Sequence, residues 1–204
     1  MPLASPYWLE ELSNGYATAA PISRVTVGLL AVAAVGVSMI GAPGAIGLLG
    51  AGLALLMLTV AIIDRRCFVI PDALTGAAFG LAIVHAAVQE PNAMLTAVAF
   101  AVVRGTVFAS VFFVIRYAYW RVRGREGLGL GDVKLAGVAG AWLDWSFMPV
   151  AVEITACVAL LVYLVRHFAL GRPIQATSRL PFGLFFAPTI WLCWLLETMV
   201  MGSL

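Results

Sequence analysis

Charged residues are scarce in this 204-residue chain: Asp, Glu, Lys and Arg together make up 11% of it, while 63% is hydrophobic. Soluble domains usually carry about a quarter charged residues, so a water-soluble fold of this size could not hide so much apolar surface. The solvent for which the chain is built is therefore lipid. The net charge of +2 is small, and no nucleic-acid partner is predicted.

Residues that bind metals or form disulfides are also few. The chain has two histidines, His85 and His167, and three cysteines, Cys67, Cys157 and Cys193, with no CxxC pair. This argues against a disulfide framework and against a structural zinc site. No Ser-His pair or His-rich cluster is present to support hydrolysis. We predict no metal and no cofactor.

Long apolar segments dominate instead. No charged residue occurs in residues 25–63, a stretch that suits two membrane helices of roughly 20 residues each, with a turn at 41–44. Further apolar segments lie at 73–88, 94–119, 133–143, 147–168 and 182–201. We predict an all-α fold, a polytopic transmembrane bundle of about 6–7 membrane helices, in which 133–143 is too short to cross the bilayer unaided.

The basic residues indicate the orientation. The predicted outer connections, 41–46, 89–93 and 144–146, contain no base. With a cytoplasmic N-terminus, the positive-inside rule is obeyed. We therefore predict a cytoplasmic or interfacial segment at 1–23 and a transmembrane domain at 24–204. The cytoplasmic ends and loops then hold eleven of the twelve bases: Arg24, Arg65, Arg66, Arg116, Arg121, Arg123, Arg125, Lys134, Arg166, Arg172 and Arg179.

The remaining base, Arg104, falls well inside a predicted membrane segment, and so does Glu153. An unpaired charge in hydrocarbon costs at least about 2.5–3.5 kcal/mol, so such groups normally face the bundle interior and pair. Counted from their shared outer face, the two residues lie at similar depths. We predict a structural Arg104–Glu153 ion pair; the functional alternative is a polar pathway or part of a substrate groove.

Two aspartates flank the first basic loop, residues 64–72. Asp72 opens the next predicted helix, where a carboxylate stabilises the helix N-terminus. Asp64 ends the preceding helix, where a negative charge opposes the helix dipole. Either Asp64 pairs with Arg65 or Arg66, or its position serves chemistry.

A glycine series precedes Asp132 in the second basic loop, where Gly127, Gly129 and Gly131 alternate with leucines before an apolar helix. Glycine permits positive φ and close backbone approach, and a helix cap alone would need no such series. The spacing fits neither a P-loop nor the dinucleotide fingerprint. Lys134 either orients Asp132 or extends to the membrane interface.

Two carboxylates at one membrane face suit peptide hydrolysis. When two carboxyl groups approach closely, the pKa of one is driven up. The ionised member can activate water as a general base, and the protonated member can donate to the scissile carbonyl and the leaving amine.

Two other functions fit parts of the pattern. A small proton-coupled transporter also contains intramembrane charges, but it places them near the bilayer midplane, often in an internally repeated fold. This chain places Asp64 and Asp132 at one face and shows no convincing repeat. A structural assembly subunit gives no reason for the glycine series before Asp132.

At these positions the chain resembles the prepilin peptidase family, membrane aspartyl proteases with a Gly-x-Gly-Asp motif. The likeness covers roughly residues 45–200. It rests on four ordered segments: Asp64 with Ile70-Pro71-Asp72, Gly-Leu-Gly-Asp-Val-Lys-Leu at 129–135, Gly-Ala-Trp-Leu at 140–143, and Pro-Phe-Gly at 181–183.

The resemblance implies an aspartic endopeptidase of the bacterial inner membrane. It implies removal of short basic leader peptides from type IV prepilins or pseudopilins, with the cut after a glycine on the cytoplasmic side and with membrane lipid around the enzyme. Asp64 and Asp132 are then the catalytic pair. The residues that support them are then Gly129, Gly131, Lys134 and Asp72.

Two departures from the family pattern stand out. Longer members carry an N-terminal segment with paired CxxC motifs, and many also methylate the new N-terminus. That segment is missing from this sequence, which puts methyltransferase activity in doubt. The family's Pro-Phe-Gly-Pro is Pro-Phe-Gly-Leu here, with Leu184 in the last place, a change that we expect to be tolerated.

Overall fold

The computed structural model describes residues 23–125, 127–170 and 181–201, which are helical almost throughout. In these ranges seven α-helices and one short 3-10 helix follow one another, and no strand occurs. The predicted all-α fold is confirmed. The helices are α2 (Arg24–Gly41), α3 (Ala45–Cys67), α4 (Asp72–Gln89), η1 (Pro91–Ala93), α5 (Met94–Arg123), α6 (Leu130–Trp142), α7 (Phe147–Leu170) and α8 (Phe182–Met201).

Six helices in the described ranges are long and apolar enough to cross a membrane, namely α2, α3, α4, α5 with η1, α7 and α8. The exception is α6, whose 13 residues extend only about 20 Å, less than the roughly 30 Å of hydrocarbon in a bilayer. The chain is thus a multi-pass membrane protein. The short helix was predicted correctly, although it begins at Leu130 rather than at 133, and α5 continues to Arg123.

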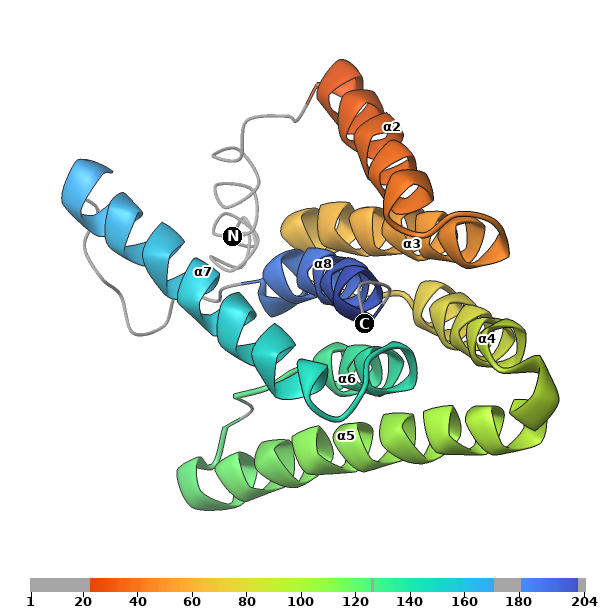
Figure 1. The fold of residues 1–204 in the computed structure, drawn as a ribbon. Helices are drawn as coiled ribbons and strands as arrows, with labels where there is room; N and C mark the ends of the chain where they lie inside the picture. The colour runs from red at the N-terminus through yellow and green to blue at the C-terminus, as the bar shows by residue number, and fades with distance from the viewer. Residues whose placement is uncertain (1–22, 126, 171–180, 202–204) are drawn as a thin grey trace, which may run out of the picture.

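The short helix α6 lies between α5 on one side and α4 and α8 on the other (Figure 1). Every residue at 135–143 is buried. Glycines allow the close contact with α5: a Cβ added at Gly140 would lie 2.7 Å from the Arg104 carbonyl oxygen, and one at Gly105 would lie 2.8 Å from the Gly137 carbonyl oxygen. Small residues give membrane helices this kind of backbone packing. Neighbouring helices therefore shield α6 from lipid, so it need not span the bilayer.

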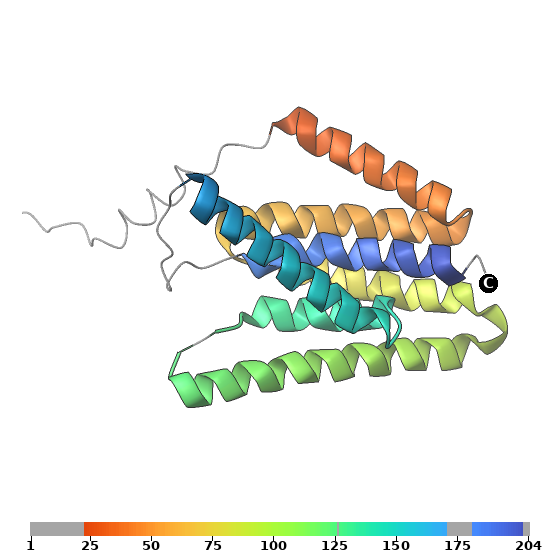
Figure 2. The ribbon, with the colours of Figure 1, turned by 60° about the vertical axis from the view of Figure 1, so that its left-hand side comes forward.

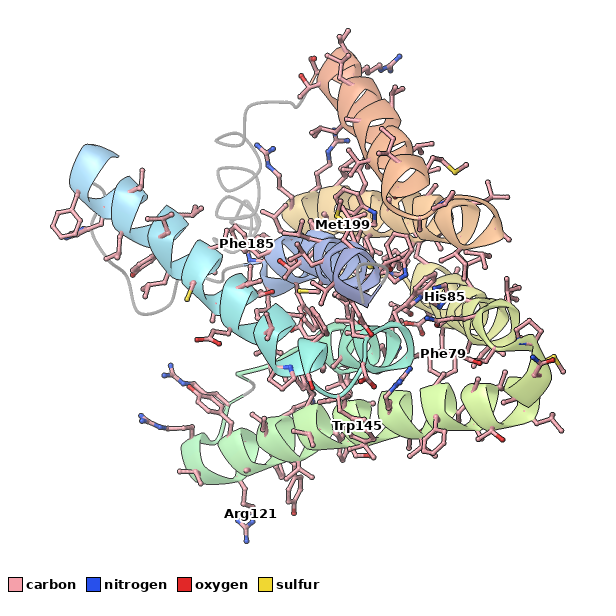
Figure 3. All side chains as sticks on the ribbon, viewed as in Figure 1. Phe79, His85, Arg121, Trp145, Phe185 and Met199 are labelled. Carbon is pink, nitrogen blue, oxygen red and sulfur yellow. The ribbon has the colours of Figure 1, made fainter. Side chains whose placement is uncertain are left out.

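Both aspartates singled out in the sequence, Asp64 and Asp132, lie at one end of the bundle. Figure 2 shows that α3 and α5 end there, and that α4, α6 and α8 begin there. Arg65 and Arg66 lie in the last turn of α3, and Arg121 and Arg123 lie in the last turn of α5. We call this the basic end. Figure 3 shows Arg121 pointing away from the bundle, as expected for a solvated base.

The predicted Arg104–Glu153 ion pair is wrong. The Arg104 guanidinium instead forms a salt bridge with Asp144, at 3.0 Å, and donates from Nε to the Gly140 carbonyl at 3.3 Å. Asp144 lies two residues after the end of α6, which packs on α5, so its carboxylate is within reach of Arg104. The Asp144 N–H in turn donates to the Glu197 carboxylate of α8 at 3.2 Å. Glu153 is exposed on α7 and is not the partner of Arg104.

Some predictions fall on residues outside the described ranges. These are the N-terminal segment 1–23, of which only Ser23 is described, and the loop bases Arg172 and Arg179.

Candidate active site

Asp64 lies in the last turn of α3 at the basic end, and only 4% of its surface is exposed. Its Oδ2 accepts a hydrogen bond from the backbone N–H of Leu184, at 2.9 Å, and the Gly183 N–H adds a second backbone hydrogen bond. Both donors belong to the first turn of α8, where N–H groups lack partners within their own helix. The positive end of the α8 dipole therefore compensates the Asp64 carboxylate, which opposes the dipole of α3.

Gly183 leaves the room that this contact needs. A Cβ at this position would lie 2.9 Å from Asp64 Oδ2 and 2.8 Å from Ile70 Cδ1. The sequence alone marked residues 181–183 only as a segment similar to the family and gave no role to Leu184. Their contact with Asp64 joins residues 120 positions apart. The one sequence signal for it is a glycine in the first turn of an otherwise apolar helix.

Asp132 is the third residue of α6 and is half-buried. Its Oδ2 accepts a hydrogen bond from the Gly129 N–H at 3.1 Å, as the acidic residue of a capping box does. Burial raises the pKa of Asp132 to about 6; the Gly129 hydrogen bond opposes this rise, and the negative charge of Asp64 adds to it. The two aspartates, from two helices, are thus electrostatically coupled.

Ile70 packs between Gly131, which precedes Asp132, and Gly183, whose N–H group binds Asp64. This residue precedes α4 and is 9% exposed. Its side chain would lie 2.9 Å from a Cβ at Gly131, just before Asp132, and 2.8 Å from a Cβ at Gly183. One branched side chain between two glycines fixes the spacing of the α6 and α8 N-termini. Ile70 was quoted with the family motif but was not predicted to have this role.

The glycine series before Asp132 serves close packing rather than positive φ. Gly129 has a φ of −73°, and the glycines with positive φ in the described residues are Gly44 and Gly124. A Cβ at Gly127 would lie 2.5 Å from the ring of Tyr119 on α5. Arg116 of α5 also donates a hydrogen bond to the Leu128 carbonyl. The end of α5 thereby holds the loop that leads to Asp132.

Lys134 forms a salt bridge with Asp72. One of its two predicted roles was to orient Asp132, and this salt bridge is made with a different carboxylate. Asp72 is the first residue of α4, as predicted. The Lys134 and Asp72 side chains are 45% and 77% exposed, and ion pairs this exposed contribute little to stability. The pair links the starts of α4 and α6.

Known proteins are similar to this chain over most of its length. Residues 51–165 match the model of the type IV leader peptidase family. The chain belongs to the type IV leader peptidase family.

Several leader peptidases are similar to it. A prepilin leader peptidase/N-methyltransferase of Burkholderia pseudomallei (strain 1026b) is 31% identical over 190 residues, which cover 91% of this chain and 53% of the relative. The enzyme of the same name from Aeromonas hydrophila is 29% identical over 94% of this chain and 64% of its own length. Leader peptidase HopD of Escherichia coli is 32% identical over 61% of this chain and 77% of its own length.

The chain thus spans about half the length of the Burkholderia leader peptidase. No solved structure matches it.

Proposed function

We propose that this leader peptidase is an aspartic endopeptidase that removes the short basic leader from type IV prepilin or pseudopilin precursors. The observation that carries the proposal is that Asp64, in the last turn of α3, and Asp132, in the first turn of α6, lie at the same end of the bundle. Each carboxylate accepts a hydrogen bond from a backbone N–H group. The donor to Asp64 is Leu184, at 2.9 Å, and the donor to Asp132 is Gly129, at 3.1 Å. Two rigidly held carboxyl groups with different environments are the requirement for general acid–base hydrolysis.

Asp64 is the member that we assign as general base. Backbone donors are aimed at its Oδ2, and hydrogen bonds of this kind favour the charged form that a base requires. It removes a proton from water as the water oxygen attacks the scissile carbonyl carbon.

Asp132 is the general acid, because burial raises its pKa to about 6 and so favours the protonated form. Its proton goes to the carbonyl oxygen as the tetrahedral intermediate forms. The proton that Asp64 took from water then goes to the leaving amine as the C–N bond breaks. The hydroxyl group that Asp132 had protonated returns its proton to Asp132 as the C=O bond re-forms.

The basic end faces the cytoplasm of a bacterial inner membrane in this proposal, as the positive-inside rule requires. The transporter alternative is less well supported, because transporter carboxylates gather near the midplane. Here both aspartates lie where α3 ends and α6 begins (Figure 2).

The test is a cleavage assay with purified protein in detergent or lipid and a panel of prepilin and pseudopilin precursors. We expect cleavage after the leader glycine. Intact precursors across the whole panel, with the protein folded, would reject the proposed function.

Leu184→Pro tests the assignment of Asp64 as the base. Proline is tolerated in the first turn of a helix but has no N–H, so the variant removes one donor from Asp64. Since a hydrogen bond to a charged group is worth about 1.5–3 kcal/mol, we expect the acidic limb of the pH–rate profile to move up by about one pH unit. Leu184→Ala keeps the N–H and is the matched control. Identical profiles for the proline and alanine variants would remove the assigned role.

Asp72→Asn is expected to retain most of the cleavage activity. Asp72 is exposed and its salt bridge with Lys134 is solvated, so its loss costs at most about 1 kcal/mol. Initial rates on the same precursor measure the effect. Loss of turnover in a folded Asp72→Asn protein would instead place this carboxylate in the chemistry.

A further inference from the structure

A groove opens along the seam of α4, α5 and α6, three helices that contact one another pairwise. Its volume is about 450 Å³. Figure 3 shows Phe79 pointing from α4 toward α5 at this seam. One face of α5 supplies most of the wall. The lining residues are Phe79, Gly105, Thr106, Ala109, Ser110, Phe113, Val114, Val133 and Gly137.

The groove suits an apolar occupant that arrives from the bilayer. Its two hydroxyl groups are already satisfied within α5: Thr106 donates to the Val102 carbonyl at 2.8 Å and Ser110 donates to the Thr106 carbonyl at 2.7 Å. Phe113 and Val114 are 52% and 62% exposed, on a helix that is long and apolar enough to cross the membrane. No charged side chain lines the groove.

The groove also leads to the candidate active site. Along α5 its lining extends from Gly105 to Val114, about 14 Å of helix, in the direction of the basic end. On α6 its lining includes Val133, which follows Asp132 directly in the chain. An apolar segment lying in the groove would therefore leave the bilayer beside Asp132.

We propose that this groove seats the apolar helix of the precursor, the segment that continues from the scissile bond into the membrane. The inference rests on the proposed function and specifies where its substrate binds. A substrate cut at the aspartates must have its membrane segment within reach of them, and this groove is an apolar surface whose lining includes Val133, the chain neighbour of Asp132. Contacts between membrane helices are the source of the binding energy.

Ser110→Trp tests the groove by filling it. Ser110 is exposed and bonds only within its own helix, so the substitution leaves the bundle packing intact. We expect KM for a full-length precursor to rise about tenfold with kcat little changed, as for the loss of one good helix–helix contact. A water-soluble peptide with the leader and scissile bond but no apolar helix should be cut by both proteins at the same kcat/KM.

Val111→Trp is the matched control, because Val111 is the next residue of α5, is 45% exposed and does not line the groove. This variant should behave like the parent. An unchanged KM in Ser110→Trp, or equal effects of the two tryptophans, would overturn the groove proposal while leaving the proposed function intact. Failure of the parent protein to cut any precursor would instead reject the proposed function.

Photo-crosslinking gives a readout that does not depend on turnover. A photoreactive amino acid at position 110 of the Asp132→Asn protein should form a covalent product with the precursor helix, and one at position 111 should not. Crosslinks to lipid alone at position 110 would mean that an acyl chain occupies the groove, and would overturn the proposal.

Discussion

Asp64→Asn and Asp132→Asn are each expected to abolish precursor cleavage. Loss of a general acid or general base typically costs about 10²–10⁴-fold in rate, and in the proposed mechanism the two groups act in the same step. Asparagine keeps the size of each side chain, so both variants should still insert into the membrane and fold. Single-turnover cleavage of one precursor by the parent and both variants measures the loss. Turnover that survives either substitution would keep the enzyme but remove that residue from the catalytic pair.

The Asp132→Asn protein should also unfold at a higher temperature than the parent above pH 6. The pKa of Asp132 is raised from its ordinary 3.8 to about 6, so the stability that this group contributes is full below pH 3.8 and is lost as the pH rises through about 6. The ionised, half-buried carboxylate then costs about 1–3 kcal/mol, which asparagine avoids. Thermal unfolding at pH 5 and pH 8 measures this, with exposed Asp72→Asn as the control. An equal unfolding temperature for variant and parent at pH 8 would contradict the role of burial.

Gly183→Ala is expected to reduce cleavage by about 10²-fold or more. The added Cβ would lie 2.9 Å from Asp64 Oδ2 and 2.8 Å from Ile70 Cδ1, so either the carboxylate or the start of α8 must move. A displacement of about 1 Å in a catalytic group can cost 10²-fold in rate. The measurement is kcat/KM on a single precursor.

Gly76→Ala provides the control for this glycine substitution. Gly76 also lies near the start of its helix, α4, and a Cβ there would meet nothing within 4 Å. This variant should cut the precursor as the parent does, and alanine should slightly stabilise α4. Full activity in Gly183→Ala would mean that the Asp64 contact with α8 is adaptable and unimportant for turnover.

The architecture was predictable because hydropathy decides where a chain meets lipid. The uncharged stretch 25–63 gave two helices and their turn, and the short apolar stretch after Asp132 gave a helix that does not span. The unfavourable position of Asp64 could also be inferred from the sequence, since a carboxylate at a helix C-terminus opposes the helix dipole and needs a compensating partner.

The compensating partner itself could not be predicted. Backbone N–H groups carry no sequence signature, and the Leu184 donor is 120 residues away from Asp64. The error over Arg104 has a related cause. The pairing was inferred from depth along the membrane, but the buried position of α6 places Asp144 beside Arg104, and helix adjacency of this kind is not encoded in hydropathy.

The dependence of Asp64 on the last helix has a consequence for biogenesis. A nascent chain that has reached α7 already contains both aspartates, but it lacks the Gly183 and Leu184 amides that hold one of them. The proposed catalytic pair is therefore complete only when α8 packs beside α3. If the proposed function holds, a chain with α2 to α7 inserted and α8 still outside the membrane would lack the assembled site and should not yet cut precursors.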